Sequence, residues 1–387
     1  MPIGARAQQP DTIVSLVNFY PGGQIFELEG HTALRIRVGG EDIAINYGMF
    51  SFEEPGFVYR FVKGETDYWV GMMPWDIFVQ HYYASGRRIV EHKLNMTGPQ
   101  KQRLLALLSD NLRPENATYR YNYVMDNCAT RPLRIIEQAM GDTIILGNDT
   151  CSLPREASFR DVMRHYHANY PWYQFGIDLA LGSGIDYPID NRQRAFAPVV
   201  LDSQMDAATV GGEPLVSESV ILNDTAPDEA IEPPTPWYLT PMAVFTLWFL
   251  IAALITVRDL RRRRTSRWFD TLLFGAYGLL GLVITYLVCI SSHEATSPNW
   301  LWAWLNPLCL IAAIGIWIKR AKKLVVCYQI VNFAVLMLLA VAWFALGQCG
   351  NVAFIPMVAA EMLRSASYIY IQTRTNPADR IARKEKT

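Results

Sequence analysis

The chain has 387 residues and a formal net charge of −1, which hides a strong division of charge along its length. Residues 1–236 hold 19 Lys and Arg against 30 Asp and Glu, whereas residues 237–387 hold 16 against 6. The basic residues belong to the most apolar part of the chain, which excludes a single soluble globule and argues against a nucleic-acid partner. The composition predicts an acidic domain outside a membrane, joined to a membrane part.

The first residues resemble the end of a processing signal. Residues 5–7 read Ala-Arg-Ala, the small-x-small pattern that precedes a signal-peptidase cut. We therefore expect residues 1–11 to be the remnant of a signal peptide or a disordered start.

Residues 12–201 mix strand and helix periodicities and predict an α+β domain with an antiparallel sheet. Gly39 and Gly40, between two β-rich runs, are a hairpin signal. The expected strands are Thr12–Tyr20, His31–Val38, Asp42–Tyr47, Asp67–Met73, Arg87–Leu94 and Arg120–Val124. The expected helices are Pro74–Ser85, Gln100–Leu112 and Cys128–Met140.

The start of that last helix is the most informative stretch of the chain. Asp126 or Asn127 is a good N-cap, which places Cys128 in the first helical turn. There the helix dipole lowers the pKa of a thiol, and unpaired backbone N–H groups can hold an oxyanion. A nucleophilic Cys also needs a base, and His31 at the start of a strand is the best candidate. Because the His precedes the Cys, the sequence predicts a permuted version of the papain-like arrangement.

Other interpretations of these residues stay open. Cys128 could form a structural disulfide with Cys151, since this side of the membrane is expected to be oxidising. His31 could be an ordinary hydrogen-bonded strand residue. Asp42 or Asn46, which share one face of the next strand, could orient His31 or could serve the sheet alone.

Residues 202–236 differ in composition from what precedes them. They hold eight acidic residues and no Lys or Arg, and they end in Pro233-Pro234-Thr235-Pro236. This composition predicts an extended, solvated linker.

Residues 237–373 contain five apolar runs, each of roughly the 20 residues that cross a bilayer. The loop Arg258–Trp268 holds six Arg, and the short loop Lys319–Lys323 and the tail 374–387 are also basic. The positive-inside rule places these segments in the cytoplasm and the N-terminal domain on the opposite side. An all-α, five-helix transmembrane domain is therefore expected, with spans Leu239–Val257, Thr271–Ile290, Trp300–Ile318, Leu324–Leu346 and Val352–Ile371.

Two charged residues fall inside the fifth run. Glu361 and Arg364 lie one helical turn apart. Charge inside a membrane is a hint of function, but a mutually paired structural couple explains the two residues as well.

An ordered set of motifs resembles a known family. Gly30-His31 with Arg35, then Asn46–Phe52, Phe61–Gly64 and Asp126–Arg131, is similar to the N-terminal periplasmic domain of the Lnb family. The segment Pro171–Gly182 looks like the C-terminal signature of the same domain, and Ser292–Trp300 resembles the first outer loop of the family's membrane domain.

The resemblance implies a bacterial inner-membrane lipoprotein N-acyltransferase whose periplasmic domain has a permuted papain-like fold. Such an enzyme moves a fatty acyl chain from a phospholipid, by way of a Cys thioester, to the N-terminal amine of a diacylated lipoprotein. It implies Cys128 as nucleophile and His31 as base, with no cofactor or metal. Candidate orienting or oxyanion residues are Asn46, Tyr47, Asp126, Asn127 and Arg131; candidate lipid or substrate contacts are Arg35, His293, Glu294, Asn299 and Trp300.

Two other functions fit parts of the sequence. The same Cys and His would serve a membrane-anchored cysteine peptidase or amidase that acts on the cell wall, although five spans are more than an anchor needs. A receptor or assembly protein without enzymatic activity would need no reactive thiol at all.

Overall fold

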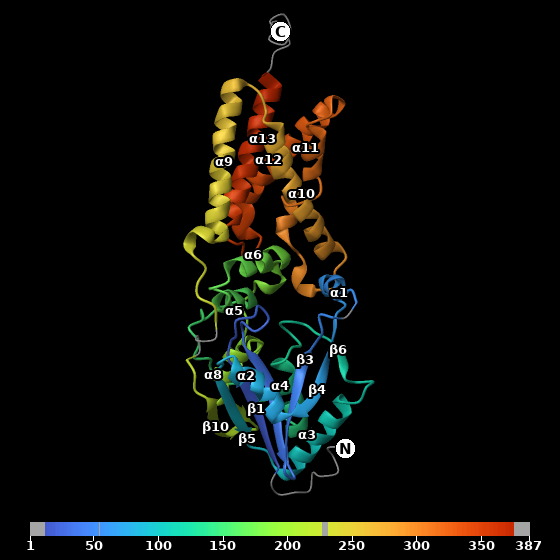
Figure 1. Cartoon of the computed structure of the whole chain (residues 1–387), viewed down its shortest axis with the longest axis vertical. Coiled ribbons are helices and arrows are strands. Elements are labelled where there is room, and N and C mark those ends of the chain that lie inside the picture. Colours follow the sequence, from blue (N-terminus) through green and yellow to red (C-terminus); the bar gives the residue numbers. More distant parts are fainter. Residues whose placement is uncertain (1–11, 54, 227–230, 375–387) are drawn as a thin grey trace, which may run out of the picture. The chain divides into compact units, whose positions relative to one another are not determined.

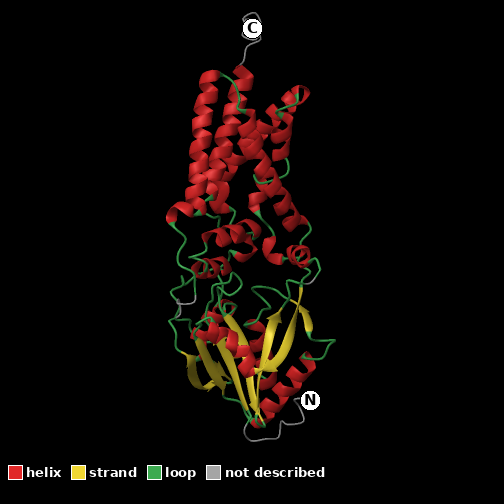
Figure 2. Cartoon of the chain, viewed as in Figure 1, coloured by secondary structure: helices red, strands yellow, loops and turns green. Residues whose placement is uncertain are grey.

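The computed structural model describes residues 12–53, 55–226 and 231–374. The chain divides into two compact units, of which the first is formed by residues up to 169 and by 188–233, and the second by 170–187 and the residues from 234 onward. Strands occur in the first unit, whereas the second is helical in its described part (Figure 2). The predicted signal remnant and all but the first residue of the predicted tail lie outside the described residues.

A seven-stranded antiparallel sheet is the centre of the first unit (Figure 1). Its strand order is β10-β5-β1-β2-β3-β4-β6. The strands are β1 Ile13–Phe19, β2 His31–Val38, β3 Glu41–Met49, β4 Asp67–Pro74, β5 Ile89–Leu94, β6 Thr118–Arg120 and β10 Val216–Asn223. The predicted α+β class with an antiparallel sheet is confirmed, and the papain-like topology stays a prediction.

Helices cover both faces of this sheet because its strands alternate two apolar sets. On one face Leu16, Leu34 and Ile45 pack with α3 (Gly98–Asn111) and α4 (Thr130–Met140). On the other face Val17, Ala33 and Ala44 pack with α2 (Trp75–Ala84). The remaining helices of the unit are α1 Phe57–Lys63, α5 Phe159–Tyr166, α7 Asn191–Arg194 and α8 Pro198–Met205, and a small second sheet joins β7 Ile144–Ile145, β8 Thr209–Val210 and β9 Glu213–Pro214.

The prediction of a linker over residues 202–236 is wrong for its first two thirds. Asp202 lies in α8, and β10 pairs with β5 at the edge of the large sheet. Two of the acidic side chains have partners far away in the sequence: Asp202 accepts a hydrogen bond from His92, and Glu218 pairs with Lys93 at 2.5 Å. Composition within the segment does not reveal partners that another strand supplies.

The segment Tyr170–Tyr187 belongs to the second unit, not to the periplasmic domain that its position in the chain suggests. It forms α6 (Pro171–Ala180), whose Phe175 packs with Phe245 and Phe354. Hydrogen bonds fix it further, as the Asn351 amide donates to Asp178 at 2.8 Å. The predicted continuous domain 12–201 is therefore interrupted by a segment that folds with the membrane part.

In the described part of the second unit, three helices are long and apolar enough to cross a membrane. They are α9 Pro241–Arg262, α10 Arg267–Cys289 and the helical stretch Lys319–Ala345, which contains α12 Lys322–Ala342. The predicted third span is not one helix: it forms a 3-10 turn, Trp300–Ala303, and α11, Cys309–Gly315, interrupted around Pro307. Helix α13, Phe354–Arg374, is long but polar in part, so the count of five spans stays a prediction.

The charged residues of α13 do not pair with each other. Arg364 is fully buried, and its guanidinium donates to Asp270 at 2.7 Å and to Asp259 at 2.8 Å. Glu361 instead accepts from the Asn332 amide at 2.9 Å. The interpretation of a Glu361–Arg364 couple is wrong, because the two side chains leave the helix toward different neighbours. Arg364 ties α13 to α9 and α10.

Replacing Arg364 by Met should destabilise the second unit strongly. The substitution leaves two buried carboxylates without their cation, a change that costs about 3–5 kcal/mol in the free energy of unfolding. Arg374→Met, at the exposed end of the same helix, is the matched control. Thermal unfolding in detergent, followed by tryptophan fluorescence, should show a large loss for Arg364→Met only; equal losses in the two variants would contradict a structural role for the buried ion pairs.

Candidate active site

Cys128 lies in a tight turn immediately before α4, two residues ahead of the first helical residue. The carboxamide oxygen of Asn127 accepts from the backbone N–H groups of Ala129 at 2.9 Å and Thr130 at 3.0 Å. The residue before the first helical residue is Ala129, so the prediction of an N-cap at Asp126 or Asn127 is two or three residues too early, and Cys128 lies ahead of the helix; the Asn127 side chain nevertheless binds the first N–H groups.

The other end of the Asn127 side chain fixes the turn to the rest of the unit. Its amide nitrogen donates to the carbonyls of Tyr123 and Phe196, each at 2.8 Å. Phe196 lies 69 residues further along the chain, so this buried amide joins the turn to the segment that leads into α8. All four hydrogen bonds hold the turn that carries Cys128 in one conformation.

The thiol of Cys128 is 7% exposed and has two donors close to its sulfur. These are the backbone N–H of Thr32, at the start of β2, and the hydroxyl of Tyr121. Gly48 lies beside the turn and against Tyr121: its φ of +85° favours glycine, and a Cβ there would stand only 3.2 Å from the Tyr121 ring.

His31 is the residue before Thr32. The turn that carries Cys128 therefore lies against the beginning of β2, next to the residue predicted to be the base. Its Nε2 lies 2.6 Å from the carboxamide oxygen of Asn46 on β3. Since an amide oxygen only accepts, Nε2 of the neutral ring carries the proton, and Nδ1 is the basic nitrogen. Of the two candidates for orienting His31, Asn46 makes the contact, while Asp42 pairs with Arg35.

Burial keeps both proposed reactive groups neutral. It raises the pKa of the Cys128 thiol to about 11, despite the donors of Thr32 and Tyr121. It also lowers the pKa of His31 to about 4, although the hydrogen bond to Asn46 opposes this shift. The expected lowering of the thiol pKa is therefore wrong: Cys128 precedes the helix and is buried, so desolvation outweighs the dipole. The resting pair is a thiol and a neutral imidazole.

Two of the predicted site residues pair with each other beside the turn. Asp126 accepts from Arg131 through both carboxylate oxygens, at 2.9 and 2.8 Å. The Arg131 guanidinium also lies 3.6 Å from the ring centre of Tyr119. A bidentate ion pair that stacks on a ring braces the start of α4. Tyr47 is fully buried in the core, and its hydroxyl has no partner among the described residues.

Arg35 is engaged in ion pairs along the sheet. It binds Asp42 through Nε at 2.8 Å and Glu91 through an Nη at 3.1 Å, and its guanidinium covers the Trp75 ring. These contacts join β2, β3 and β5, and give Arg35 a role in the sheet.

The four predicted residues of the outer loop belong to the second unit. Asn299 is buried and joins two segments, since its amide donates to the Leu179 carbonyl at 2.9 Å and its oxygen accepts from Gln348 at 3.0 Å. Glu294 and Trp300 are exposed, and His293 is half-buried. Their contact with lipid or substrate stays a prediction.

Tyr121 is a site residue that the sequence analysis missed. Its hydroxyl meets both the sulfur and the backbone N–H of Cys128, and its ring stacks on Tyr68 at 4.3 Å. Three tyrosines alternate at 119, 121 and 123, and nothing in the local pattern tells which ring faces the thiol. Because Asn127 occupies the N–H groups of Ala129 and Thr130, the candidate oxyanion donors are reduced to Cys128 N–H and this hydroxyl, which bond each other at rest and would have to turn to the oxyanion.

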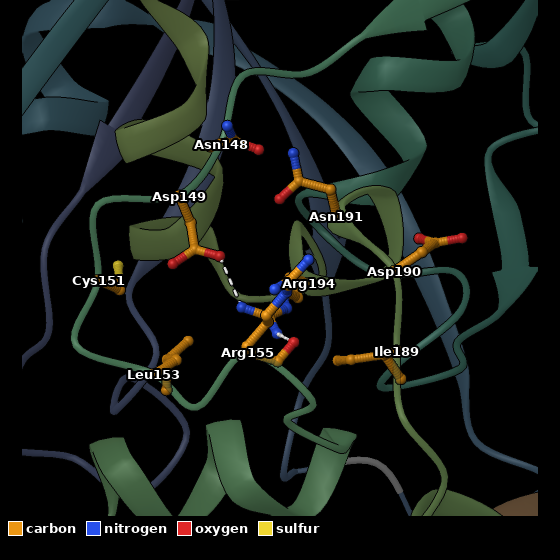
Figure 3. Close-up of a pocket in the computed structure, with 9 residues that line it drawn as sticks. All are labelled: Asn148, Asp149, Cys151, Leu153, Arg155, Ile189, Asp190, Asn191 and Arg194. Atoms are coloured by element: carbon orange, nitrogen blue, oxygen red, sulfur yellow. Dashed lines mark hydrogen bonds and ion pairs between the residues drawn. The ribbon is translucent and has the colours of Figure 1, made fainter.

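Cys151 is free, as is Cys128, so the alternative of a disulfide between them is wrong. Cys151 borders a separate polar cavity of about 400 Å³, in which Arg194 binds Asp149 at 2.9 Å (Figure 3). Cys128 and His31 are not among the residues that line this cavity, which are Asn148, Asp149, Cys151, Leu153, Arg155, Ile189, Asp190, Asn191 and Arg194. In the described part of the chain, no group of His, Cys, Asp or Glu is arranged to hold a metal ion.

Two family models match the chain. Residues 3–154 match the Lnb N-terminal periplasmic domain, and residues 233–376 match the Lnb transmembrane domain. The first match includes His31, Asn46, Tyr121 and Cys128. No curated protein and no solved structure matches the chain.

Thiolate formation at Cys128 should require strongly alkaline solution. With a pKa near 11 the thiol stays protonated at pH 7, and the thiolate appears only as the pH rises toward that value. The measurement is the absorbance of the thiolate at 240 nm, taken as the difference between the protein and its Cys128→Ser variant so that the other thiols cancel. A midpoint below pH 8 would contradict the dominance of burial.

Proposed function

This chain belongs to the Lnb family, and from that premise we propose that it is a lipoprotein N-acyltransferase. The two matched domains make it a lipoprotein-processing enzyme of the inner membrane, with a periplasmic domain. The proposal adds the reaction: transfer of a fatty acyl chain from a phospholipid to the N-terminal amine of a diacylated lipoprotein.

The observation that carries the proposal is the position of Cys128 against Thr32, the residue that follows His31 on β2. A buried Cys128 lies against the start of β2, where His31 is oriented by the amide oxygen of Asn46. Cys, His and Asn are the parts of a papain-like thiol enzyme, here in the chain order His, Asn, Cys. A Cys beside the strand that carries a His supports the assignment of a nucleophile and its base.

In the first half-reaction Cys128 attacks the ester carbonyl of the donor lipid. Nδ1 of His31 takes the thiol proton as the C–S bond forms, because a free thiolate is not available beforehand. The N–H of Cys128 and the hydroxyl of Tyr121 hold the oxyanion. When the tetrahedral intermediate collapses, His31 returns the proton to the departing alkoxide, and a lysophospholipid leaves.

In the second half-reaction the lipoprotein amine attacks the thioester. His31 accepts a proton from the attacking nitrogen and delivers it to the sulfur, so that an amide and the free thiol are formed. A buried sulfur favours this outcome over hydrolysis, because water has little access to the thioester while the acceptor is awaited.

An acyl thioester should form on Cys128 when the full-length protein is incubated with phospholipid. Intact-mass and peptide mass spectrometry should show the mass of one fatty acyl group on the peptide with Cys128, and none in Cys128→Ala. His31→Ala should form it at least ~10²-fold more slowly, since it lacks the base. Cys151→Ser is the matched control and should react normally; acylation at Cys151, or hydrolysis of cell-wall fragments without thioester, would contradict the proposal.

Asn46 should tune the acid limb of the pH profile. In Asn46→Asp a carboxylate replaces the amide, stabilises the imidazolium and raises the pKa of His31 above about 4. Activity requires neutral His31 and is lost as the pH falls through its pKa, so the acid limb of kcat/KM should move to higher pH. Asp42→Asn, next to Arg35, is the control; an unmoved limb in Asn46→Asp would contradict the assignment of Asn46 as the positioning residue.

A further inference from the structure

A group of exposed apolar side chains lies in the loop before β2 and in the connection between β3 and β4. Phe26 is 53% exposed, Phe52 64% and Val58, on α1, 71%. Phe50 and Phe57 pack beneath them. We call this set, Phe26, Phe50, Phe52, Phe57 and Val58, the aromatic lip. An exposed cluster of this kind marks a binding surface, because a soluble domain gains nothing by leaving several large apolar groups in water.

The aromatic lip continues inward as an unbroken series of ring contacts. Phe26 and Phe52 each contact Phe50, at ring-centre distances of 6.0 and 4.9 Å. Phe50 contacts Tyr68 at 5.2 Å, and Tyr68 stacks on Tyr121 at 4.3 Å. The hydroxyl of Tyr121 reaches the sulfur of Cys128. The exposed side chains of the aromatic lip and the ring beside the sulfur of the proposed nucleophile therefore belong to one continuous series of packed rings.

The aromatic lip is attached to the strands that form the site. Its residues from Phe50 to Val58 follow β3 directly, after a register shift between Asn46 and Met49, and lead into α1, which Figure 1 labels. Asn46 orients His31, and Gly48 faces Cys128. Only a few residues of β3 separate the aromatic lip from Asn46 and Gly48. A molecule bound to the aromatic lip is therefore held close to the proposed reacting groups.

We propose that the aromatic lip and the rings of Tyr68 and Tyr121 bind the fatty acyl chain of the donor lipid and lead its carbonyl to Cys128. The inference rests on the proposed acyl transfer and names the group that its site recognises. The rings of this series offer apolar surface, which suits a hydrocarbon chain. At the inner end of the series, the hydroxyl of Tyr121 lies at the sulfur of Cys128. A peptide or a cell-wall glycan would need polar partners along its whole length; a fatty acyl chain has its one polar group at the end.

Chain-length selectivity tests the inference in the full-length protein in detergent. Thioester formation on Cys128 is followed by mass spectrometry with a palmitoyl phospholipid and with a soluble butyryl ester. In Phe52→Ser/Val58→Ser the ratio of the palmitoyl rate to the butyryl rate should fall at least tenfold. The matched control is Ile77→Ser/Ile145→Ser, because these residues are 62% and 66% exposed elsewhere on the same unit. A ratio unchanged in the variant of the aromatic lip, or lowered equally in the control, would overturn the inference.

A second measurement does not depend on catalysis. A phospholipid with a diazirine in its acyl chain should crosslink to residues 55–63 in both the wild type and Cys128→Ser. Absence of the crosslink at these residues overturns the acyl-chain site, even where the wild type forms a thioester. A crosslink without any thioester on the wild type instead overturns the proposed acyl transfer and leaves a lipid-binding surface.

Discussion

The hydrogen bonds of Asn127 are the constraint on which the rest of the candidate site depends. One buried carboxamide binds the first N–H groups of α4 and two carbonyls, one of them 69 residues away. This fixes the turn in which Cys128 meets the N–H of Thr32. It also uses the backbone N–H groups of Ala129 and Thr130, so oxyanion stabilisation falls to Cys128 N–H and Tyr121. A buried amide whose oxygen and nitrogen each bind two backbone groups can adopt few other conformations without losing these hydrogen bonds, which keeps the turn rigid.

Burial of the thiol has two opposite effects on the proposed chemistry. It raises the pKa of Cys128 to about 11, while burial of the imidazole lowers the pKa of His31 to about 4, so no ion pair exists at rest. The same burial limits the access of water to a thioester that must wait for a second substrate. An enzyme that transfers an acyl group to an amine benefits from this balance, since a reactive but exposed thiolate would favour hydrolysis. The series of packed rings from Phe26 to Tyr121 gives the proposed acyl chain an apolar surface beside the thiol.

Local pattern was enough for much of the fold. The strands at His31–Val38 and Asp67–Pro74 and the helix at Gly98–Asn111 follow from periodicity and turn chemistry, and the structure has them within one or two residues. The prediction for the acidic segment from Asp202 is wrong because its partners lie on another strand, where His92 donates a hydrogen bond and Lys93 forms an ion pair. The third apolar run was misjudged because length and hydropathy do not register the break around Pro307.

The sequence by itself determined the division into an acidic domain and a basic, apolar one, because this division depends on composition. It also determined the family and the candidates Cys128, His31 and Asn46, because these depend on short motifs of residues close in the chain. The tertiary structure alone decided that Asn46 and not Asp42 faces His31, that Tyr121 faces the thiol, that Arg364 binds Asp259 and Asp270, and that Tyr170–Tyr187 folds with the membrane part. The physical reason is that burial and partner choice depend on strand register and helix packing between distant segments, which no local pattern encodes.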